Sequence, residues 1–416
     1  MNLPEHGLSR GEVLEHLEAV RVDDKDWRRG RCFGLVFSAG DDVEQVGREA
    51  SMMYLSENAL NPLAFPSLGR LQHDVVEMVT GMLHGSDEAA GFMTSGGTES
   101  ILLAVEAARN RASAERGISA PQMVIAESAH AAFHKAGSYF DVTVRTIPVR
   151  SDWTADVGAM ADAVTDDTVL VVGSAPQYPQ GVMDPIPDIA ALAAERDVNC
   201  HVDACMGGFV LPFMESLGHD VAPWDFRIPG VTSISADVHK LGYAPKGASV
   251  LVHRNAGLRK HHIFVFDDWL GGFYASTGIA GTKPAGPIAA AWAVMSYLGR
   301  DGYERLVGLV LDASRRMVDG VRAIPGLTVL GAPIAHNLAI AAEDSSQLDV
   351  FRVMDVLGTR GWHLDRQSPP DSLHATVAAS NAAHVDEFLA DLRAAVDEVG
   401  VERTDDRSTE YAPLPE

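Results

Sequence analysis

The chain has 416 residues, of which 46% are hydrophobic and 22% are charged, as is usual for a soluble globular protein. At about 100–200 residues per domain, this length favours about two or three structural units. The formal charge of −24 excludes nucleic acid and anionic membranes as bulk partners, because both bind basic surfaces. An anionic substrate would therefore need positive charge placed locally at its site.

The termini and the cysteines predict a cytoplasmic protein. The polar, acidic N-terminus has no signal-peptide pattern. No run reaches the roughly 18 apolar residues that an integral membrane segment requires. Cys32, Cys200 and Cys205 form no CxxC pair, which favours reduced thiols.

Residues 1–60 are predicted to form a helical arm. Ser9 and Glu12 make a capping box at the start of a helix. One face of that helix is apolar and carries Val13, Leu14, Leu17 and Val20. After a Pro-rich stretch, a second helix is expected to turn inward Leu71, Val75, Val76, Met78, Val79 and Leu83.

Residues 61–300 are predicted to form a large α/β domain. From about residue 90, helical patterns alternate with short apolar segments, namely GFMTSG, QMVIAES, TVRTIPV, TVLVVGSA, NCHVDA, VTSISAD and ASVLVHR. This alternation is typical of a mainly parallel sheet. A long helix with a Gly-rich break follows, and then residues 301–402 mix strands and helices in a smaller α+β domain. Residues 403–416 are expected to be a flexible tail.

The segment TSGGTES, residues 94–100, suits a phosphate-binding site. It follows an apolar segment and opens an amphipathic helix, so backbone N–H groups around Gly97 and the Thr98 hydroxyl face a potential anion. The segment is neither a P-loop nor a GxGxxG motif. A plain turn with a Ser/Thr cap explains it equally well.

Four further residues lie at or just after strand ends, where α/β sheets bind ligands. Asp203 in HVDA could bond a protonated ring nitrogen, although capping of the next helix is the likelier role for this residue taken alone. Lys240 in SADVHK could form a Schiff base if its pKa were lowered, although a single lysine is usually solvated. His130 could stack on a flat cofactor, and His239 could donate to a phosphate, but each could also simply cap or pack.

Other catalytic patterns are absent from the sequence. His261 and His262 lack the spacing of zinc ligands, so no metal is expected. No GxSxG elbow is present, which argues against a serine hydrolase of that type.

A phosphate cup, a stacking histidine, an acid and an imine-forming lysine, in that order on an α/β domain, together predict pyridoxal 5'-phosphate (PLP) as cofactor.

The sequence resembles the sphingosine-1-phosphate lyase family, which belongs to the decarboxylase-like PLP enzymes with the aspartate-aminotransferase fold (fold type I). The resemblance covers most of residues 50–400. It is carried by TSGGTESILLAV, AESAHAAFHKAGSYF, APQYPQGVMDPIP, HVDACMGGFVLPFMES, DFRIPGVTSISADVHKLGYAPKGASVLVH, DDWLGGFYASTGIAGTKPAG and, more loosely, RGWHLDRQSPPDSLHATV.

The resemblance implies a role for each residue of the cofactor site. Lys240 would hold PLP as a Schiff base, Asp203 would bond its ring nitrogen, and His130 would stack on the ring. The cofactor phosphate would be held by Gly97, Thr98 and His239, with Thr282 contributed by the neighbouring subunit. A homodimer with sites shared across its interface is therefore expected.

The implied reaction is a retro-aldol-like cleavage of a phosphorylated 2-amino-3-hydroxy long-chain substrate to an aldehyde and phosphoethanolamine. Lys246 would bind the substrate phosphate and Lys283 could help, while Tyr54 would line the entrance. A PLP-dependent amino-acid decarboxylase on the same scaffold is the alternative. A binding protein without catalysis is disfavoured because Lys240, Asp203 and His130 are retained.

Three departures from the family pattern fall among the substrate-phosphate contacts. Asn61 stands where the family usually has a histidine. Lys283 stands where an arginine is usual, so the bidentate fork of a guanidinium is lost. Gln180 also replaces a histidine. These departures leave the expected cofactor contacts intact and reduce the expected contacts to a substrate phosphate.

Overall fold

The computed structural model describes residues 2–409 of the chain. Its largest sheet has seven strands in the order β1-β7-β6-β5-β4-β2-β3. Strands β3, β2, β4, β5 and β6 run parallel, and β7 is antiparallel to both of its neighbours. The strands are β1 (Ala90–Thr94), β2 (Gln122–Ala126), β3 (Thr143–Ile147), β4 (Thr168–Ser174), β5 (Asn199–Asp203), β6 (Ser233–Ala236) and β7 (Ser249–His253). The mainly parallel α/β sheet predicted from the sequence is confirmed.

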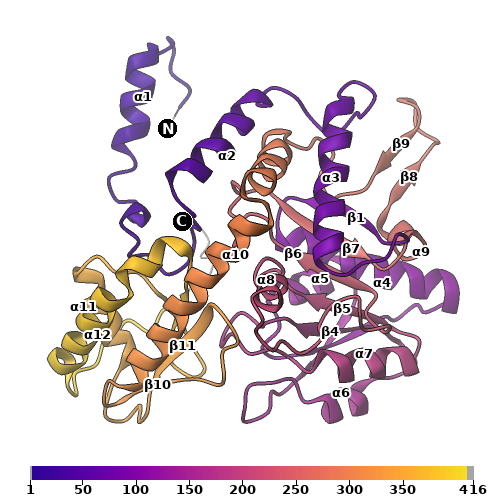
Figure 1. Ribbon diagram of the computed structural model, residues 1–416. Coiled ribbons are helices and arrows are strands. Elements are labelled where there is room, and N and C mark those ends of the chain that lie inside the picture. Colours follow the sequence, from indigo (N-terminus) through magenta and orange to yellow (C-terminus); the bar gives the residue numbers. More distant parts are fainter. Residues whose placement is uncertain (1, 410–416) are drawn as a thin grey trace.

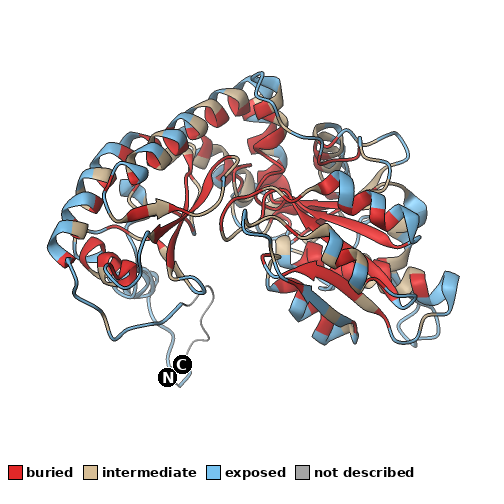
Figure 2. Cartoon of the chain, turned by 90° about the horizontal axis from the view of Figure 1, so that it is seen from below, coloured by how far each residue is buried: buried red, intermediate tan, exposed pale blue. Residues whose placement is uncertain are grey.

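Helices cover both faces of this sheet, which explains why its strands are continuous apolar segments. On β2, Met123 and Ile125 pack into one core with α4 (Gly97–Arg116) and α5 (Ala132–Phe140). Val124 and Ala126 face the opposite core, with α6 (Val157–Ala163) and α7 (Ile186–Glu195). Strands β4, β5, β6 and β7 are accordingly buried along their whole length, whereas the edge strand β3 is largely exposed (Figure 2).

The long helix α10 (Gly286–Arg322) links the large sheet to a second, smaller sheet (Figure 1). It changes direction at Gly299, whose φ of 58° and ψ of −175° are not helical. This is the Gly-rich break expected from the sequence. The helix packs against α2 (Asp41–Met53), α3 (Pro66–Met82) and α8 (Leu211–Ser216).

The small sheet is antiparallel, with the order β10-β11-β13-β12. Its elements are β10 (Leu327–Val329), β11 (Asn337–Ala342), β12 (Asp365–Gln367), β13 (Ser372–Thr376), α11 (Val350–Thr359) and α12 (Val385–Val399). Phe33 reaches this core from the N-terminal part of the chain, with ring centroids 5.9 Å from Trp362 and 4.9 Å from Phe388. Part of the predicted N-terminal arm therefore packs with the small sheet.

Two segments leave apolar side chains exposed. Helix α1 (Arg10–Ala19) has the predicted capping box, in which Ser9 Oγ accepts from Glu12 N at 3.3 Å and Glu12 Oε2 accepts from Ser9 N at 2.8 Å. No residue of α1 is buried, and the helix stands apart from the body of the chain (Figure 1).

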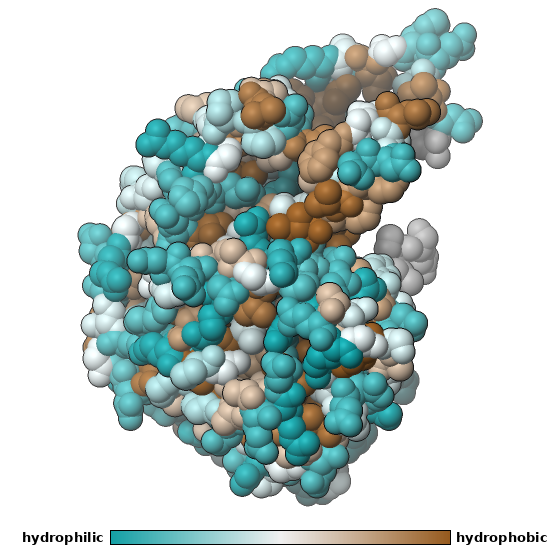
Figure 3. Space-filling model, turned by 90° about the vertical axis from the view of Figure 1, so that its right-hand side faces the viewer, coloured by the Kyte–Doolittle hydropathy of each residue, from teal (hydrophilic) through white to brown (hydrophobic). Residues whose placement is uncertain are grey.

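The sequence did not predict the second segment, a hairpin of β8 (Phe264–Phe266) and β9 (Tyr274–Ser276). It exposes Phe264, Val265, Phe266, Trp269, Leu270 and Phe273. The hairpin lies on the side that Figure 3 faces, where hydrophobic surface gathers in the upper half of the view.

The remaining short helices are α9 (Ala256–Arg259) and three 3-10 turns at Trp27–Arg29, Lys260–His262 and Ala379–His384. In the described part of the chain, residues 2–409, no helix has the length and apolar character needed to cross a membrane.

Candidate active site

Lys240 lies four residues beyond the end of β6, beside a buried carboxylate. Its Nζ is 3.0 Å from Asp237 Oδ2, and Asp237 Oδ1 accepts from Ser249 Oγ at 2.5 Å. Asp237 is only 2% exposed. Burial acts to raise the pKa of Asp237, but Lys240, His239 and Ser249 together hold it below its usual value. The acid three residues before the lysine was visible in SADVHK, but no role was assigned to it from the sequence.

The glycine-rich turn between β1 and α4 packs directly against this lysine segment. A Cβ on Gly97 would lie 2.8 Å from Cys205 Sγ and 2.9 Å from Asp237 Oδ2. A Cβ on Gly96 would come within 3.5 Å of the His239 ring. Close approach of the backbone therefore requires glycine at position 97. The first N–H groups of α4 open at the same place, where they can bind an anion.

His239 faces the glycine turn as a neutral donor. Its Nδ1 accepts from Ala248 N at 3.2 Å, which leaves the proton on Nε2. Burial lowers the pKa of His239, although Asp237 acts in the opposite direction. Thr98, at the start of α4, and Thr282, on the loop before α10, are both exposed in the single chain.

Asp203 ends β5 and is held rigidly. Its Oδ1 accepts from Cys205 N at 3.0 Å and from Ser235 Oγ at 3.3 Å. His201, two residues earlier, bonds Ser235 Oγ at 3.2 Å and Ser233 Oγ at 2.9 Å. Burial lowers the pKa of His201 to about 4, so this ring remains a neutral support for the carboxylate.

His130 follows β2 and also points toward this region. Its Nδ1 accepts from Ala132 N at 3.1 Å, which fixes the tautomer with the proton on Nε2. Burial lowers the pKa of His130, partly opposed by the charge of Asp203. Near neutral pH the ring is therefore uncharged and can stack on a flat ligand. The charges of Asp203 and Lys240 both act on the pKa of His130, as expected if the three residues line one site.

Lys246 lies in the turn before β7 and remains exposed in the single chain. Its Nζ donates to the His239 carbonyl at 3.4 Å and lies 4.7 Å from the centre of the Phe37 ring. Partial burial and the charge of Lys240 lower the pKa of Lys246 to about 8, with Asp237 acting the other way. Its ammonium thus lies beside the Lys240 segment but is bonded to backbone.

Lys283 points into its own chain. Its Nζ donates to Gln72 Oε1 at 2.8 Å and to the Met93 carbonyl, and it lies 4.0 Å from the centre of the Phe92 ring. Burial lowers the pKa of Lys283 to about 8, opposed by Glu99. In this arrangement the amine braces the loop against β1.

Tyr54 and Asn61 lie on the segment that pairs with the Lys283 loop, through a hydrogen bond from Ala59 N to the Lys283 carbonyl at 2.9 Å. Tyr54 is half-buried at the end of α2. Asn61 is exposed, and its Oδ1 accepts from Leu63 N at 3.0 Å. Asn61 therefore stabilises its own turn.

A cavity of about 880 Å³ adjoins His130, within the 300–1,000 Å³ range typical of ligand sites. Its wall is formed by the loops that follow β2, β3 and β4, by residues of the small sheet and by Thr409. The lining residues include Val149, Trp153, Tyr178, Gln180, Asp365 and Pro369.

Tyr178 is a wall residue that sequence reasoning missed. Its ring centre is 3.9 Å from that of His374, and its hydroxyl donates to Asp365 Oδ2 at 3.1 Å. The tyrosine was part of the quoted segment APQYPQG, but its partners lie on the small sheet far along the chain. Gln180 is buried, and its Oε1 accepts from Gln177 Nε2 at 2.9 Å.

Arg366 is the arginine on this wall, but its guanidinium is already bound. It donates to Asp355, to the Phe351 carbonyl at 3.0 Å, and to Asp406 Oδ2 at 3.0 Å. It is therefore not presented to a substrate carboxylate. Among residues 2–409, no group of three or more His, Cys, Asp or Glu side chains could hold a metal ion.

Comparison with known proteins bears on this arrangement. The family described as the pyridoxal-dependent decarboxylase conserved domain matches residues 18–331. The chain is 42% identical over 405 residues to the sphingosine-1-phosphate lyase of Oryza sativa subsp. japonica, covering 95% of this chain and 74% of that protein.

Solved structures agree with this match. The sphingosine-1-phosphate lyase of Burkholderia pseudomallei superposes with a TM-score of 0.91 at 40% identity, covering 95% of this chain and 92% of that one. The glutamate decarboxylase of Lactobacillus brevis superposes with a TM-score of 0.85 at 21% identity, covering 97% and 96%. The second likeness shows a shared fold alone.

Proposed function

The chain belongs to the PLP-dependent decarboxylase-like family that includes the sphingosine-1-phosphate lyases, and on that premise we propose that it cleaves a phosphorylated 2-amino-3-hydroxy long-chain substrate. The products are a long-chain aldehyde and phosphoethanolamine. The C2–C3 bond breaks, the 3-hydroxyl loses its proton, and C2 gains one.

The residues present fit PLP. Lys240 supplies the amine, and the absence of a side chain at Gly97 leaves a turn of open N–H groups beside His239. Asp203 supplies a fixed carboxylate, and His130 supplies a neutral, flat ring. When bound, PLP supplies an electron sink for the pair left at C2 when the C2–C3 bond breaks.

The side chains of this site have separable tasks in that chemistry. Lys240 would hold the cofactor through its amine. Asp203 keeps a proton on the ring nitrogen, which its rigid bonds to Cys205 N and Ser235 Oγ support. His130 would orient the ring by stacking. Because His130 is neutral, it adds no second positive charge to the site.

The observation that carries the choice of substrate is the distribution of cations around the site. Lys246 places an ammonium beside His239 and is bonded only weakly to a backbone carbonyl, so a phosphate can recruit it. By contrast, Arg366 is bound by carboxylates, which disfavours the recognition of an amino-acid carboxylate by this arginine. The decarboxylase alternative is therefore the weaker candidate.

The active form is a homodimer. The exposed hairpin β8–β9 leads directly into the loop that carries Thr282, and its aromatic side chains form an apolar surface of the kind that subunit contacts bury. Thr282 from one subunit completes the phosphate cup of the other. The enzyme works in the cytoplasm, as its reduced, buried cysteines suggest.

The decisive experiment is to incubate the purified enzyme with PLP and either sphingosine 1-phosphate or a panel of amino acids. Mass spectrometry then distinguishes the two reactions. An aldehyde together with phosphoethanolamine supports the proposal. An amine lighter than its amino acid by one carbon dioxide, without cleavage of sphingosine 1-phosphate, would assign the chain to the decarboxylases.

A further inference from the structure

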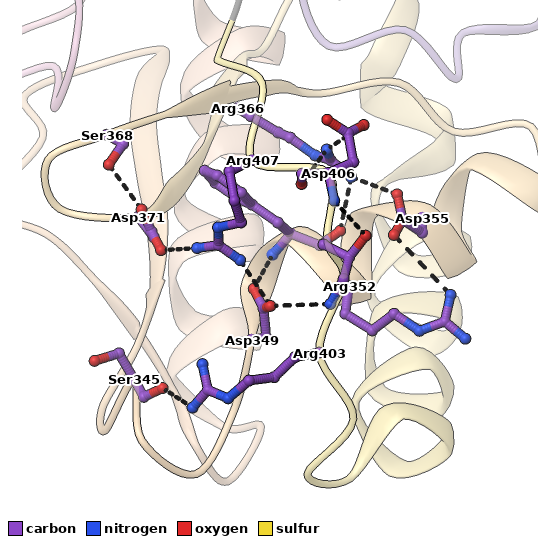
Figure 4. A network of polar contacts seen from close by, with 12 residues as sticks. Ser345, Asp349, Arg352, Asp355, Arg366, Ser368, Asp371, Arg403, Asp406 and Arg407 are labelled. Atoms are coloured by element: carbon purple, nitrogen blue, oxygen red, sulfur yellow. Dashed lines mark hydrogen bonds and ion pairs between the residues drawn. The ribbon is translucent and has the colours of Figure 1, made fainter.

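The last described residues, 403–409, form an extended strap across the small sheet. Arg407 joins it to two carboxylates, with Nη1 2.7 Å from Asp349 Oδ2 and Nη2 bonded to Asp371 (Figure 4). Asp406 adds a second attachment, since its carboxylate and its carbonyl accept from Arg366 at 3.0 and 3.1 Å. The strap was expected to be part of a flexible tail; residues 410–416 lie outside the described part.

The Arg407 contact is built into the fold, unlike most surface ion pairs. Asp349 is 4% exposed and caps α11, where its Oδ1 accepts from Phe351 N at 3.0 Å. Thr404 N also donates to Asp349 Oδ2, at 3.3 Å, and the Arg407 guanidinium lies 4.5 Å from the centre of the Phe351 ring. A buried carboxylate that is both cap and anchor needs its cationic partner.

The same arginine organises two parts of the cavity wall beside His130. Thr409, two residues after Arg407, lines the cavity. Asp371 closes the turn that follows β12 through a bond from Ser368 Oγ at 2.7 Å, and Ser368, Pro369 and Pro370 line the cavity as well. Breaking the Arg407 contacts would therefore loosen the strap and the turn together, leaving the strap attached mainly through Asp406 and Arg366.

We infer that the strap is a specificity element: fastened by Arg407, it holds Thr409 in the outer wall of the subsite that binds the substrate's alkyl chain. This inference rests on the proposed function. The cavity suits a chain because Val149, Trp153 and the prolines line it. It does not suit the phosphate, because the acids Glu127 and Asp365 also line it and its arginine is neutralised. Arg407 acts here as a positioning residue, through the wall that it holds.

The test compares Arg407→Met with the control Arg403→Met in the PLP-loaded enzyme. Methionine keeps the stem that packs on Phe351 and removes both ion pairs. Arg403 lies on the same strap but, among residues 2–409, donates only to the Ser345 carbonyl. We expect Arg407→Met to lower kcat/KM for sphingosine 1-phosphate about tenfold, as when roughly two methylenes lose their contacts, and to leave a short-chain analogue nearly unchanged. Arg403→Met should change neither value appreciably.

Hydrogen exchange must show that residues 403–409 are released in Arg407→Met. A released strap with unchanged chain-length preference overturns the inference. If Arg407→Met folds poorly, Asp371→Asn breaks the clamp at its half-buried end, with the same expectations. A strap that stays protected in both variants would show that Arg407 does not hold it, and would equally overturn the inference.

Failure of the proposed function has a separate signature, because binding can be measured without turnover. Calorimetry of dodecyl phosphate with the loaded enzyme should give weaker binding in Arg407→Met than in wild type and Arg403→Met. Equal binding in all three proteins counts against the strap. If Arg407→Met binds dodecyl phosphate more weakly but the wild type cleaves no sphingosine 1-phosphate, the strap would be retained and the reaction rejected.

Discussion

The proposed cofactor side of the site and its proposed substrate-phosphate side are built very differently. Lys240, Asp203 and His130 are each fixed by neighbours within one chain, and Asp203 and its supports are buried. Lys246 and Asn61 are exposed. Each makes its hydrogen bonds to backbone atoms nearby in the chain. Preorganised contacts suit a resident cofactor, whereas the exposed side chains of the substrate side remain adaptable. This contrast makes distinct predictions for the two sides.

The largest effect is expected at Lys240. Lys240→Ala should remove the visible absorbance of bound cofactor and lower kcat at least about a thousandfold, because the amine that holds the cofactor is lost. Absorbance spectra and turnover measure the two effects. The exposed Lys260→Ala should change neither. A Lys240→Ala enzyme that keeps the wild-type spectrum would remove this lysine from the cofactor site.

The rigid carboxylate should be the next most sensitive position. Asp203→Asn keeps the shape but cannot hold a proton on the ring nitrogen by charge, so kcat should fall at least about a hundredfold while the protein stays folded. Asp184→Asn is a matched control, because Asp184 is also buried and accepts from Ser174 N at 2.8 Å and Ala155 N at 2.9 Å. Asp184→Asn should lower the free energy of unfolding by about 1–3 kcal/mol and leave kcat unchanged. Melting curves and kcat together separate the two outcomes.

Much of the architecture followed from the sequence, since continuous apolar segments between helical patterns specify a parallel sheet whose two faces are both covered. The β8–β9 hairpin was missed because its aromatic segment is interrupted by Asp267, Asp268 and paired glycines and lacks a clean alternation. The candidate cofactor residues stand out because each lies at a strand end or a helix start. Their roles stay predictions.

Contacts between distant parts of the chain could not be predicted in this way. The bond from Tyr178 to Asp365 joins residues 187 positions apart, and that from Arg407 to Asp349 joins residues 58 positions apart. No local pattern marks either pair, because the first exists only once the small sheet is placed against the large one, and the second only once the strap is laid on α11. Lys283 likewise carries the charge expected of a phosphate ligand, yet only the fold shows its amine turned toward β1.

On the substrate side, the pH dependence of KM should identify the lysine that binds the substrate phosphate. The pKa of Lys246 is lowered to about 8, so its ammonium is present below pH 8 and is lost as the pH rises through that value. KM for the phosphorylated substrate should therefore rise several-fold above pH 8. In Lys246→Arg the rise should vanish, because arginine stays protonated. Lys283 has a similarly lowered pKa, so a rise that persists in Lys246→Arg but vanishes in Lys283→Arg would transfer the role to Lys283.

The smallest effect is expected where the two sides meet, at Thr282. Thr282→Ala removes a single hydroxyl from the phosphate cup and should weaken PLP binding about fivefold to tenfold, as the loss of one solvent-exposed hydrogen bond of about 1 kcal/mol does. Mixed dimers test which subunit supplies that hydroxyl. In a dimer of one Thr282→Ala subunit and one Lys240→Ala subunit, a site with both an intact Lys240 and an intact Thr282 exists only if the loop crosses the interface. Wild-type PLP affinity at that site is therefore expected. Affinity that stays weakened in the mixed dimer would mean that Thr282 serves its own chain, and that the cofactor side, unlike the substrate side, is complete without the partner.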